Sequence, residues 1–289
     1  MVDSKMDKIR QHLENLVGER NPFTRPENLE KAAQYISRQF KSMGLAVTHE
    51  TVDYEGTQSL NILGEKLGVP GKNGLFVIAA HYDSVPDSPG ADDNASAVTA
   101  LLEIARELSQ IPLQKSLLFS AFTLEEYGFI GSKYFIDFDL TRKNRVSGMI
   151  SLEMVGYTNK EPGSQSYPPY VDPGQYSDTG DFIAVVGNEP SASLARELAG
   201  EMSRSTPSLK VEVLVVPGQG DQLAEVRLSD HSPFWDAGIP AVMVTDTAFF
   251  RNPNYHQPSD TIDTLDLEFI RDNAMAVAGF LKQFLNQTD

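Results

Sequence analysis

The sequence predicts an α/β fold in which a largely parallel, twisted sheet is covered by helices on both faces. Two observations predict this fold. Short continuous apolar runs, typical of strands buried on both faces, alternate along the chain with segments whose apolar residues recur at helical spacing. No obvious linker interrupts the alternation, and 289 residues suffice for one large α/β domain, so we expect a single domain over residues 1–289.

Each helix is predicted from the spacing of its apolar residues and from the residues that bound it. Residues 27–43 have apolar side chains at helical spacing, with Pro26 at the start and Gly44 just past the end. The same periodicity predicts helices over residues 94–108, near 191–202 and over 267–285, the last being a long amphipathic helix that closes the chain.

The strands are predicted from continuous apolar runs, at residues 75–80, 116–122, 146–152, 182–186, 211–216 and 241–244. In a sheet of parallel strands, ligands bind outside the carboxyl ends of the strands. Two connections, residues 156–180 and 217–233, are long for a compact domain, and loops of that length are more often functional than idle.

Composition and charge exclude several classes of protein. With 40% hydrophobic and 22% charged residues, the chain is neither disordered nor collagen-like nor a coiled coil. Its net charge of −16 repels phosphate backbones and anionic lipid, so we expect neither nucleic acid nor membrane as a partner. Because cysteine is absent, any metal must be held by carboxylates and by the five histidines, which are His12, His49, His81, His231 and His256.

The N-terminal residues form no apolar signal-peptide core, and no apolar run has the length of a membrane span. As the sequence stands, we expect a cytoplasmic protein. A secreted or periplasmic location is the alternative if the N-terminus was trimmed.

Polar residues gather where the predicted strands end. His81 follows the first buried strand, and Asp83, two residues on, faces the same side of an extended chain. Asp83 can accept the second ring N–H of His81, which is the usual arrangement around a metal-bound imidazole. The alternative is a histidine with a purely structural role.

Acidic pairs follow this histidine at two places. Asp92 and Asp93 precede a helix start; an N-cap explains Asn94 but does not need two acids, whereas one carboxylate there can bridge two cations. Glu125 and Glu126 end the next strand, and neighbouring extended residues point to opposite sides. One of them can therefore bind a metal while the other takes a proton from water; a solvated sheet edge is the alternative.

Further acids and histidines complete the pattern. Glu153 ends the third buried strand, although exposure is the simpler explanation for a single glutamate at that place. His256 lies in a loop rich in Pro and Asn, where no structural role explains it. Asp260, four residues on, is also a candidate helix cap.

Taken together, these fragments resemble the M28 family of zinc peptidases. The matching motifs occur in family order and are His81-x-Asp83-Ser84, Gly90-Ala-Asp92-Asp93-Asn94-Ala-Ser96, Glu125-Glu126-x-Gly128, Glu153, Ser229-Asp230-His231-x-Pro-Phe and Tyr255-His256-x-x-x-Asp260-Thr261. The resemblance covers about two thirds of the chain. It implies one catalytic peptidase domain with a three-layer α/β/α sandwich around a mostly parallel, twisted mixed sheet.

The resemblance also implies a site with two zinc ions per chain, for which Co²⁺ or Mn²⁺ are possible substitutes. Carried over position by position, the roles are these: Asp92 bridges both ions, His81 and Glu153 complete the first, Glu126 and His256 complete the second, Glu125 is the general base, Asp83 orients His81, and Tyr255 steadies the tetrahedral intermediate. A cis peptide bond is expected between Asp92 and Asp93.

The activity implied by the resemblance is that of a metallopeptidase, most simply an aminopeptidase that hydrolyses N-terminal residues of peptide or aminoacyl substrates. One departure concerns specificity, because many aminopeptidases of the family have Asp where this chain has Glu153. The alternatives are a glutaminyl-cyclase-like acyltransferase with a single zinc and a non-enzymatic interaction domain.

The loop of residues 156–180 contains four tyrosines that we expect to line the substrate pocket, unless they pack the loop onto the body of the protein. They are Tyr157, Tyr167, Tyr170 and Tyr176.

Overall fold

The computed structural model describes residues 4–70, 74–139 and 143–287. Its centre is one eight-stranded sheet with the order β1-β2-β4-β3-β5-β8-β6-β7. The strands are β1 (Ala46–Tyr54), β2 (Thr57–Lys66), β3 (Leu75–His81), β4 (Ser116–Phe122), β5 (Val146–Glu153), β6 (Phe182–Asn188), β7 (Lys210–Val216) and β8 (Ala241–Thr245).

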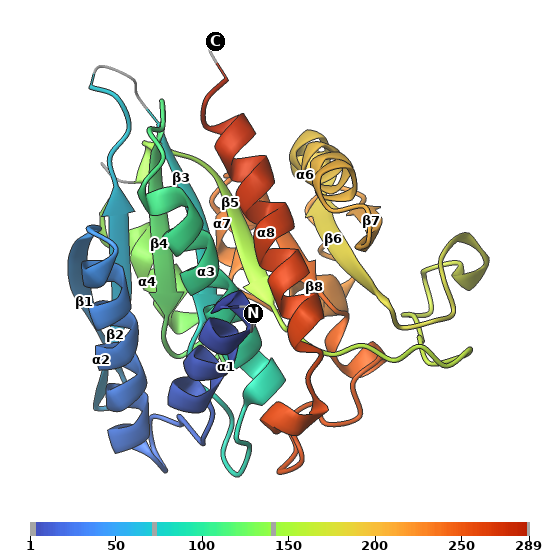
Figure 1. Ribbon diagram of the computed structural model, residues 1–289, viewed down its shortest axis with the longest axis horizontal. Coiled ribbons are helices and arrows are strands. Elements are labelled where there is room, and N and C mark those ends of the chain that lie inside the picture. Colours follow the sequence, from blue (N-terminus) through green and yellow to red (C-terminus); the bar gives the residue numbers. More distant parts are fainter. Residues whose placement is uncertain (1–3, 71–73, 140–142, 288–289) are drawn as a thin grey trace.

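The helices form a layer on each face of this sheet (Figure 1), which confirms the predicted three-layer fold. Their bounds are α1 (Ser4–Leu16), α2 (Pro26–Ser42), α3 (Ala97–Ser109), α4 (Ile130–Phe138), α6 (Ala192–Ser205), α7 (His231–Asp236) and α8 (Leu267–Phe284). Residues of α1, α2, α3, α6 and α8 share one apolar core with the sheet, whereas α4 and α7 contribute to the core on the opposite face.

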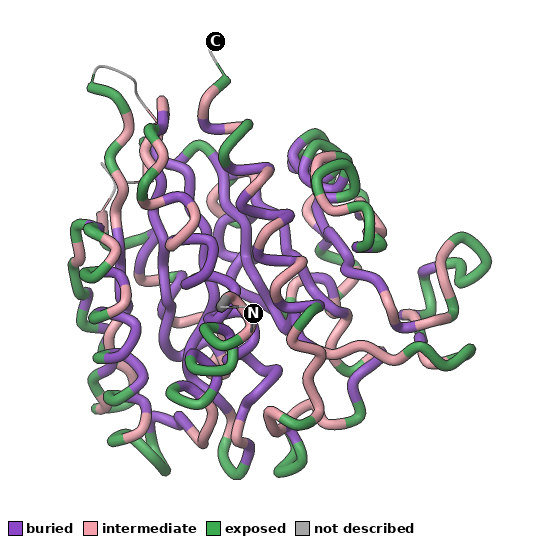
Figure 2. Tube along the Cα trace, viewed as in Figure 1, coloured by how far each residue is buried: buried purple, intermediate pink, exposed green. Residues whose placement is uncertain are grey.

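The mixed character of the sheet determines where the carboxyl ends of its strands meet. β4, β3, β5 and β8 are mutually parallel neighbours, while β1, β2 and β6 each join an antiparallel pair. Every residue of β3 is buried, as its continuous apolar run predicts, and Figure 2 shows burial concentrated along these central strands. The parallel strands therefore end together at one edge of the sheet.

Five elements were not among those predicted: the helices α1, α4 and α7 and the strands β1 and β2. The β1–β2 hairpin turns at Glu55 and Gly56, both with positive φ, and most side chains of β1 are at least partly exposed, so β1 lacks the apolar run of a buried strand. The helices α4 and α7 span only 9 and 6 residues, too few to show a helical period. The helix predicted from residue 94 begins as α3 at Ala97, after a kinked turn over Ala91–Ser96.

Within the described ranges, every helix is either too short or too polar to span a bilayer.

Candidate metal centre

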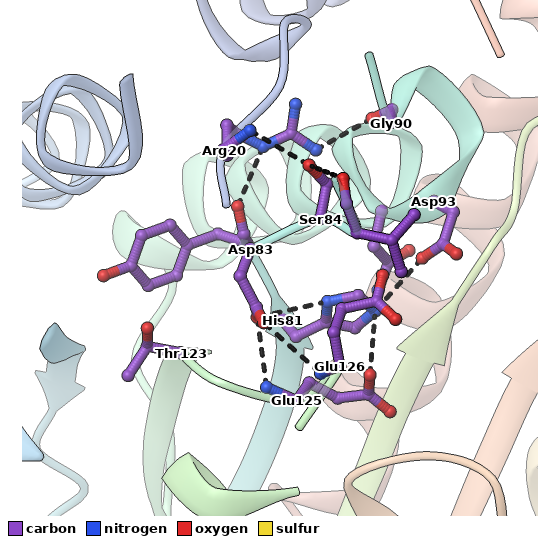
Figure 3. Close-up of polar contacts among 12 residues, drawn as sticks. Arg20, His81, Asp83, Ser84, Gly90, Asp93, Thr123, Glu125 and Glu126 are labelled. Atoms are coloured by element: carbon purple, nitrogen blue, oxygen red, sulfur yellow. Dashed lines mark hydrogen bonds and ion pairs between the residues drawn. The ribbon is translucent and has the colours of Figure 1, made fainter. Parts of the chain in front are cut away.

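The carboxyl ends of three neighbouring parallel strands bring the candidate residues together. His81 is the last residue of β3 and Glu153 the last of β5, while Glu125 and Glu126 follow β4 after a short turn. Because β3 lies between β4 and β5, side chains from the three strand ends meet beside His81: Figure 3 shows Glu125 and Glu126 there, and Glu153 Oε2 lies 3.4 Å from His81 Nε2. The structure therefore brings these residues together at one edge of the sheet, as predicted.

Within the described residues, the side chains form three overlapping groups whose possible metal-ligating atoms lie within 4.8 Å of one another. They are His81, Asp93 and Glu153; His81, Glu125 and Glu126; and Asp93, Glu126 and His256.

Asp93 links the first of these groups to the third. Its Oδ1 lies 3.3 Å from His81 Nε2, and its Oδ2 lies 3.1 Å from His256 Nε2. Glu153 Oε2 lies 3.4 Å from His81 Nε2, and Glu126 Oε2 lies 3.3 Å from His256 Nε2. One carboxylate thus faces two histidines with one oxygen each, and each histidine has a second carboxylate beside it. Imidazole nitrogens and carboxylate oxygens in such sets fit zinc.

Asp92, the predicted bridging residue, is not in these groups. Its carboxylate accepts hydrogen bonds from the Gly156 N–H at 2.9 Å and from Asn252 Nδ2 at 2.7 Å, and so points away from the histidines. The cis peptide bond follows Asp93 and joins it to Asn94, one residue later than expected. The prediction was wrong by one residue because adjacent side chains of a turn diverge, and the motif alone does not say which of two acids faces inward.

Asp260 and Asn94 hold this turn in place. The Asp260 carboxylate accepts the N–H groups of Asp92 and Asp93 at 2.9 and 3.1 Å. The Asn94 side chain accepts the Met154 N–H at 2.9 Å and donates to the Leu152 carbonyl at 3.1 Å. The turn is therefore tied directly to the end of β5, which positions Asp93 relative to Glu153.

Gly90, at the start of the turn, has φ of 60° and no room for a side chain. A Cβ there would clash with the Asp93 carbonyl oxygen and lie 2.8 Å from Arg20 Nη2. We expect Gly90→Ala to cost about 3 kcal/mol or more and to weaken zinc binding, because Asp93 must shift. Gly238→Ala is the matched control, since Gly238 has φ of 72° and no atom within 4 Å of its Cβ position. Its expected cost is about 1 kcal/mol. Equal losses of stability in the two variants, measured by thermal unfolding, would contradict a steric clash at Gly90.

Asp83 orients the other side of the cluster. Its Oδ1 lies 3.5 Å from His81 Nδ1, as predicted for a residue that orients this imidazole. The same carboxylate accepts the N–H groups of Glu125 and Glu126 at 3.2 and 3.3 Å (Figure 3). Asp83 therefore fixes the backbone of the two glutamates and places its carboxylate beside the histidine.

Electrostatics favour positive charge at this cluster. Burial raises the pKa of Glu126 to about 7 and, together with nearby carboxylates, raises the pKa of Glu125 well above its usual range. Burial alone would lower the pKa of His81 and His256. The carboxylates outweigh it, and they raise the pKa of His81 well above its usual range and that of His256 to about 10. Divalent cations would supply the charge that these carboxylates favour.

Tyr255 lies beside the cluster, and its ring stacks on that of His256 with 3.8 Å between centroids. The other three histidines lie elsewhere. The Nε2 atom of His12 lies 3.3 Å from Glu103 Oε1, that of His49 contacts the Ser37 hydroxyl, and that of His231 contacts the Val226 carbonyl. Burial lowers the pKa of His231 to about 4. Of the five histidines, only His81 and His256 belong to the metal-ligating groups within the described ranges.

Two residues that the sequence did not single out support the site. Arg20, 1% exposed, donates to the carbonyl oxygens of Tyr82 and Gly90 at 2.8 Å each, and so joins the end of β3 to the turn that precedes Asp93 (Figure 3). Asp246 follows β8 and accepts the Tyr157 N–H at 2.9 Å. Burial raises the pKa of Asp246 to about 6. A third residue, Ser229, begins the motif Ser229-Asp230-His231, and its Oγ donates to Glu153 Oε2 at 2.8 Å.

A cavity opens beside the cluster, and Glu153 and Tyr255 are in its lining. Of the four tyrosines expected to line a pocket, Tyr167 and Tyr176 do so. Tyr157 and Tyr170 are outside the lining, and the hydroxyl of Tyr170 donates to Glu225 Oε2 at 3.2 Å.

Residues 61–281 match the model of peptidase family M28. The uncharacterized protein YfbL of Escherichia coli is 38% identical over 252 residues, which cover 84% of this chain and 76% of YfbL. Aminopeptidase YwaD of Bacillus subtilis is 34% identical over 222 residues, which cover 73% of this chain but only 41% of YwaD.

Among solved structures, BSAP, a zinc aminopeptidase from Bacillus subtilis, superposes with a TM-score of 0.63 at 27% identity, covering 81% of this chain and 52% of that one. Porphyromonas gingivalis glutaminyl cyclase superposes with a TM-score of 0.72 at 21% identity, covering 98% of each chain. At that identity the second likeness concerns the fold alone.

Proposed function

Because the chain belongs to peptidase family M28, we propose that it is an aminopeptidase that removes N-terminal residues from peptides by means of water activated at two zinc ions. The observation that carries the proposal is the position of Asp93, whose two oxygens lie 3.3 Å from His81 Nε2 and 3.1 Å from His256 Nε2. A carboxylate shared between two ligand groups is the arrangement that a pair of bridged cations requires.

In this proposal His81, Asp93 and Glu153 hold one zinc ion, and Asp93, Glu126 and His256 hold the other. The three carboxylates would contribute −3 against +4 from the two ions, so the occupied site would keep a net positive charge that favours an anionic group. When bound, zinc lowers the pKa of a water molecule towards neutrality and polarises the scissile carbonyl.

Glu125 is the proposed general base. It is 7% exposed, and its Oε2 lies 3.8 Å from His81 Nε2, so its carboxylate borders the ligand groups. It would take the proton of the attacking water and pass it to the leaving amine. Tyr255, next to His256, is the proposed group that steadies the tetrahedral intermediate.

The competing acyltransferase function would need one zinc ion and hence one ligand group. The two ligand groups that share Asp93 provide places for two ions, and this favours the peptidase. The interaction-domain alternative is disfavoured because every ligand position carries a metal-binding side chain.

We expect about two zinc ions per chain by elemental analysis, together with hydrolysis of aminoacyl-nitroanilides that a chelator abolishes and added zinc restores. N-acetylated versions of the same substrates serve as controls, because an aminopeptidase requires the free amino group. One zinc per chain with cyclisation of N-terminal glutamine would instead support the acyltransferase, and hydrolysis of blocked peptides at the same rate would exclude strict aminopeptidase specificity.

A further inference from the structure

The cavity beside the candidate metal centre has a floor made of the sheet itself. Four residues lie opposite one another on neighbouring strands. Glu153 of β5 is paired with Thr245 of β8, Thr245 with Ala184 of β6, and Ala184 with Glu212 of β7. All four residues are in the lining. They form one row across four strands, and with neighbouring strands about 4.8 Å apart the Cα atoms of the two glutamates are roughly 14 Å apart.

This row has a glutamate at each end and short side chains between them. Thr245 and Ala184 leave a hollow that a substrate side chain can fill. The adjacent row on the same face is apolar, because Met243 pairs with Val186 and Val186 pairs with Leu214. A side chain that enters from the cluster thus meets apolar surface along its length and a carboxylate at the end.

Among the described residues, no cationic side chain pairs with Glu212. No lysine, arginine or histidine is in the lining. Neither Glu212 nor Glu225, the third glutamate in the lining, forms an ion pair within the described part of the chain. Burial raises the pKa of Glu212, with no compensating charge. The nearby arginines have other partners: Arg227 binds Asp236, and Arg251 binds Gln165 and the Phe182 carbonyl.

The length of the hollow suits a long side chain. A fully extended lysine reaches about 6 Å from its Cα to its terminal nitrogen, and the side chain of Glu212 spans part of the remaining distance. Long basic side chains combine an aliphatic stem with a cationic head, which matches the apolar row and the carboxylates beyond it.

Resting on the proposed aminopeptidase function, we propose that this cavity selects lysine or arginine as the N-terminal residue of the substrate, with Glu212 and Glu225 facing the cationic head. The apolar residues hold the stem. A cavity that recognised only the stem would prefer norleucine, whose side chain is the four-carbon stem of lysine without the ammonium group.

The test compares kcat/KM for N-terminal lysine and norleucine in otherwise identical fluorogenic amides, with the zinc-loaded enzyme at pH 7.5. We expect lysine to be preferred by about tenfold, and arginine likewise, because a charge-assisted contact in a partly buried site contributes about that factor. In Glu212→Gln the lysine-to-norleucine ratio falls close to one. Glu225→Gln lowers the same ratio and serves as an independent second variant.

Glu14→Gln is the matched control. Glu14 is exposed on α1, and the change removes the same single charge outside the cavity. If this variant lowered the ratio as much as Glu212→Gln does, general attraction by the −16 chain would explain the preference and the proposal would be overturned.

Two further results would overturn the proposal, and they separate it from the proposed function. If norleucine and leucine amides are hydrolysed as well as lysine amides, or if Glu212→Gln leaves the ratio unchanged, the aminopeptidase function stands and the cationic specificity fails. If no aminoacyl amide is hydrolysed by zinc-loaded enzyme, the function itself fails and the specificity fails with it.

Discussion

Glu125→Gln is expected to retain zinc and to lose nearly all turnover. The amide has almost the same shape as the carboxylate but cannot accept a proton from water, so the loss should be at the upper end of the range for general-base removal, about 10³- to 10⁴-fold in kcat. The main chain at this position should be unaffected, because Asp83 binds the N–H of residue 125 rather than its side chain.

The measurement is steady-state kcat with zinc content determined on the same preparation. Glu126→Gln is the matched comparison: it changes the adjacent residue, whose carboxylate lies 3.3 Å from His256 Nε2, and we expect it to lose zinc as well as activity. Near-normal turnover in Glu125→Gln would remove Glu125 from the role of general base. Zinc loss in both variants would make Glu125 a ligand instead.

The central part of the fold could be predicted because its strands are simple in composition. β3 and β4 are apolar along almost their whole length, since helices cover both faces of the sheet, and their bounds therefore follow from the sequence. β1 could not be predicted in that way. It lies at the edge of the sheet, most of its side chains are exposed or partly exposed, and its stability comes from pairing with β2.

In the candidate site, the sequence likewise could not predict the orientation of one residue. The sequence identifies an acidic turn but not which acid faces the histidines, because that is decided by distant partners. The carboxylate that holds the turn, Asp260, is 167 residues along the chain from Asp93. Asp92 is turned the other way by hydrogen bonds from Gly156 and Asn252.

Arg20 lies beyond sequence reasoning for a different reason. Arginine is usually exposed, so nothing in the local sequence indicates that this side chain is buried among carbonyl oxygens. Its partners belong to the end of β3 and the turn at Gly90, which come together only in the folded chain.

Removal of zinc should lower the melting temperature, and by more as the pH rises. Each zinc ion present at a thousand times its Kd stabilises the native state by about 4 kcal/mol. For two ions in a chain of this size the total corresponds to a loss on the order of 10 °C on chelation.

The pH dependence follows from the directions of the pKa shifts. Glu126, with its pKa raised to about 7, and His256, with its pKa raised to about 10, both bind protons more tightly in the folded metal-free protein than in the unfolded chain. Their contributions to stability are therefore lost as pH rises through these folded values. The histidines hold the pKa of Asp93 below its usual value despite burial, and this group contributes stability that is constant above pH 5.

Between pH 5 and 9 the metal-free protein should thus become steadily less stable. The zinc-loaded protein becomes more stable over the same pH range, because fewer protons compete with zinc for the ligand side chains. Thermal unfolding of both forms at pH 5.5, 7 and 8.5 measures the gap between the melting temperatures of the zinc-loaded and the metal-free protein. We expect this gap to widen as the pH rises. His231→Gln is a control, since this histidine lies outside the ligand groups and the variant should keep the zinc-dependent gap. A gap that is absent or narrows with pH would mean that the four carboxylates and two histidines are held together by something other than cations.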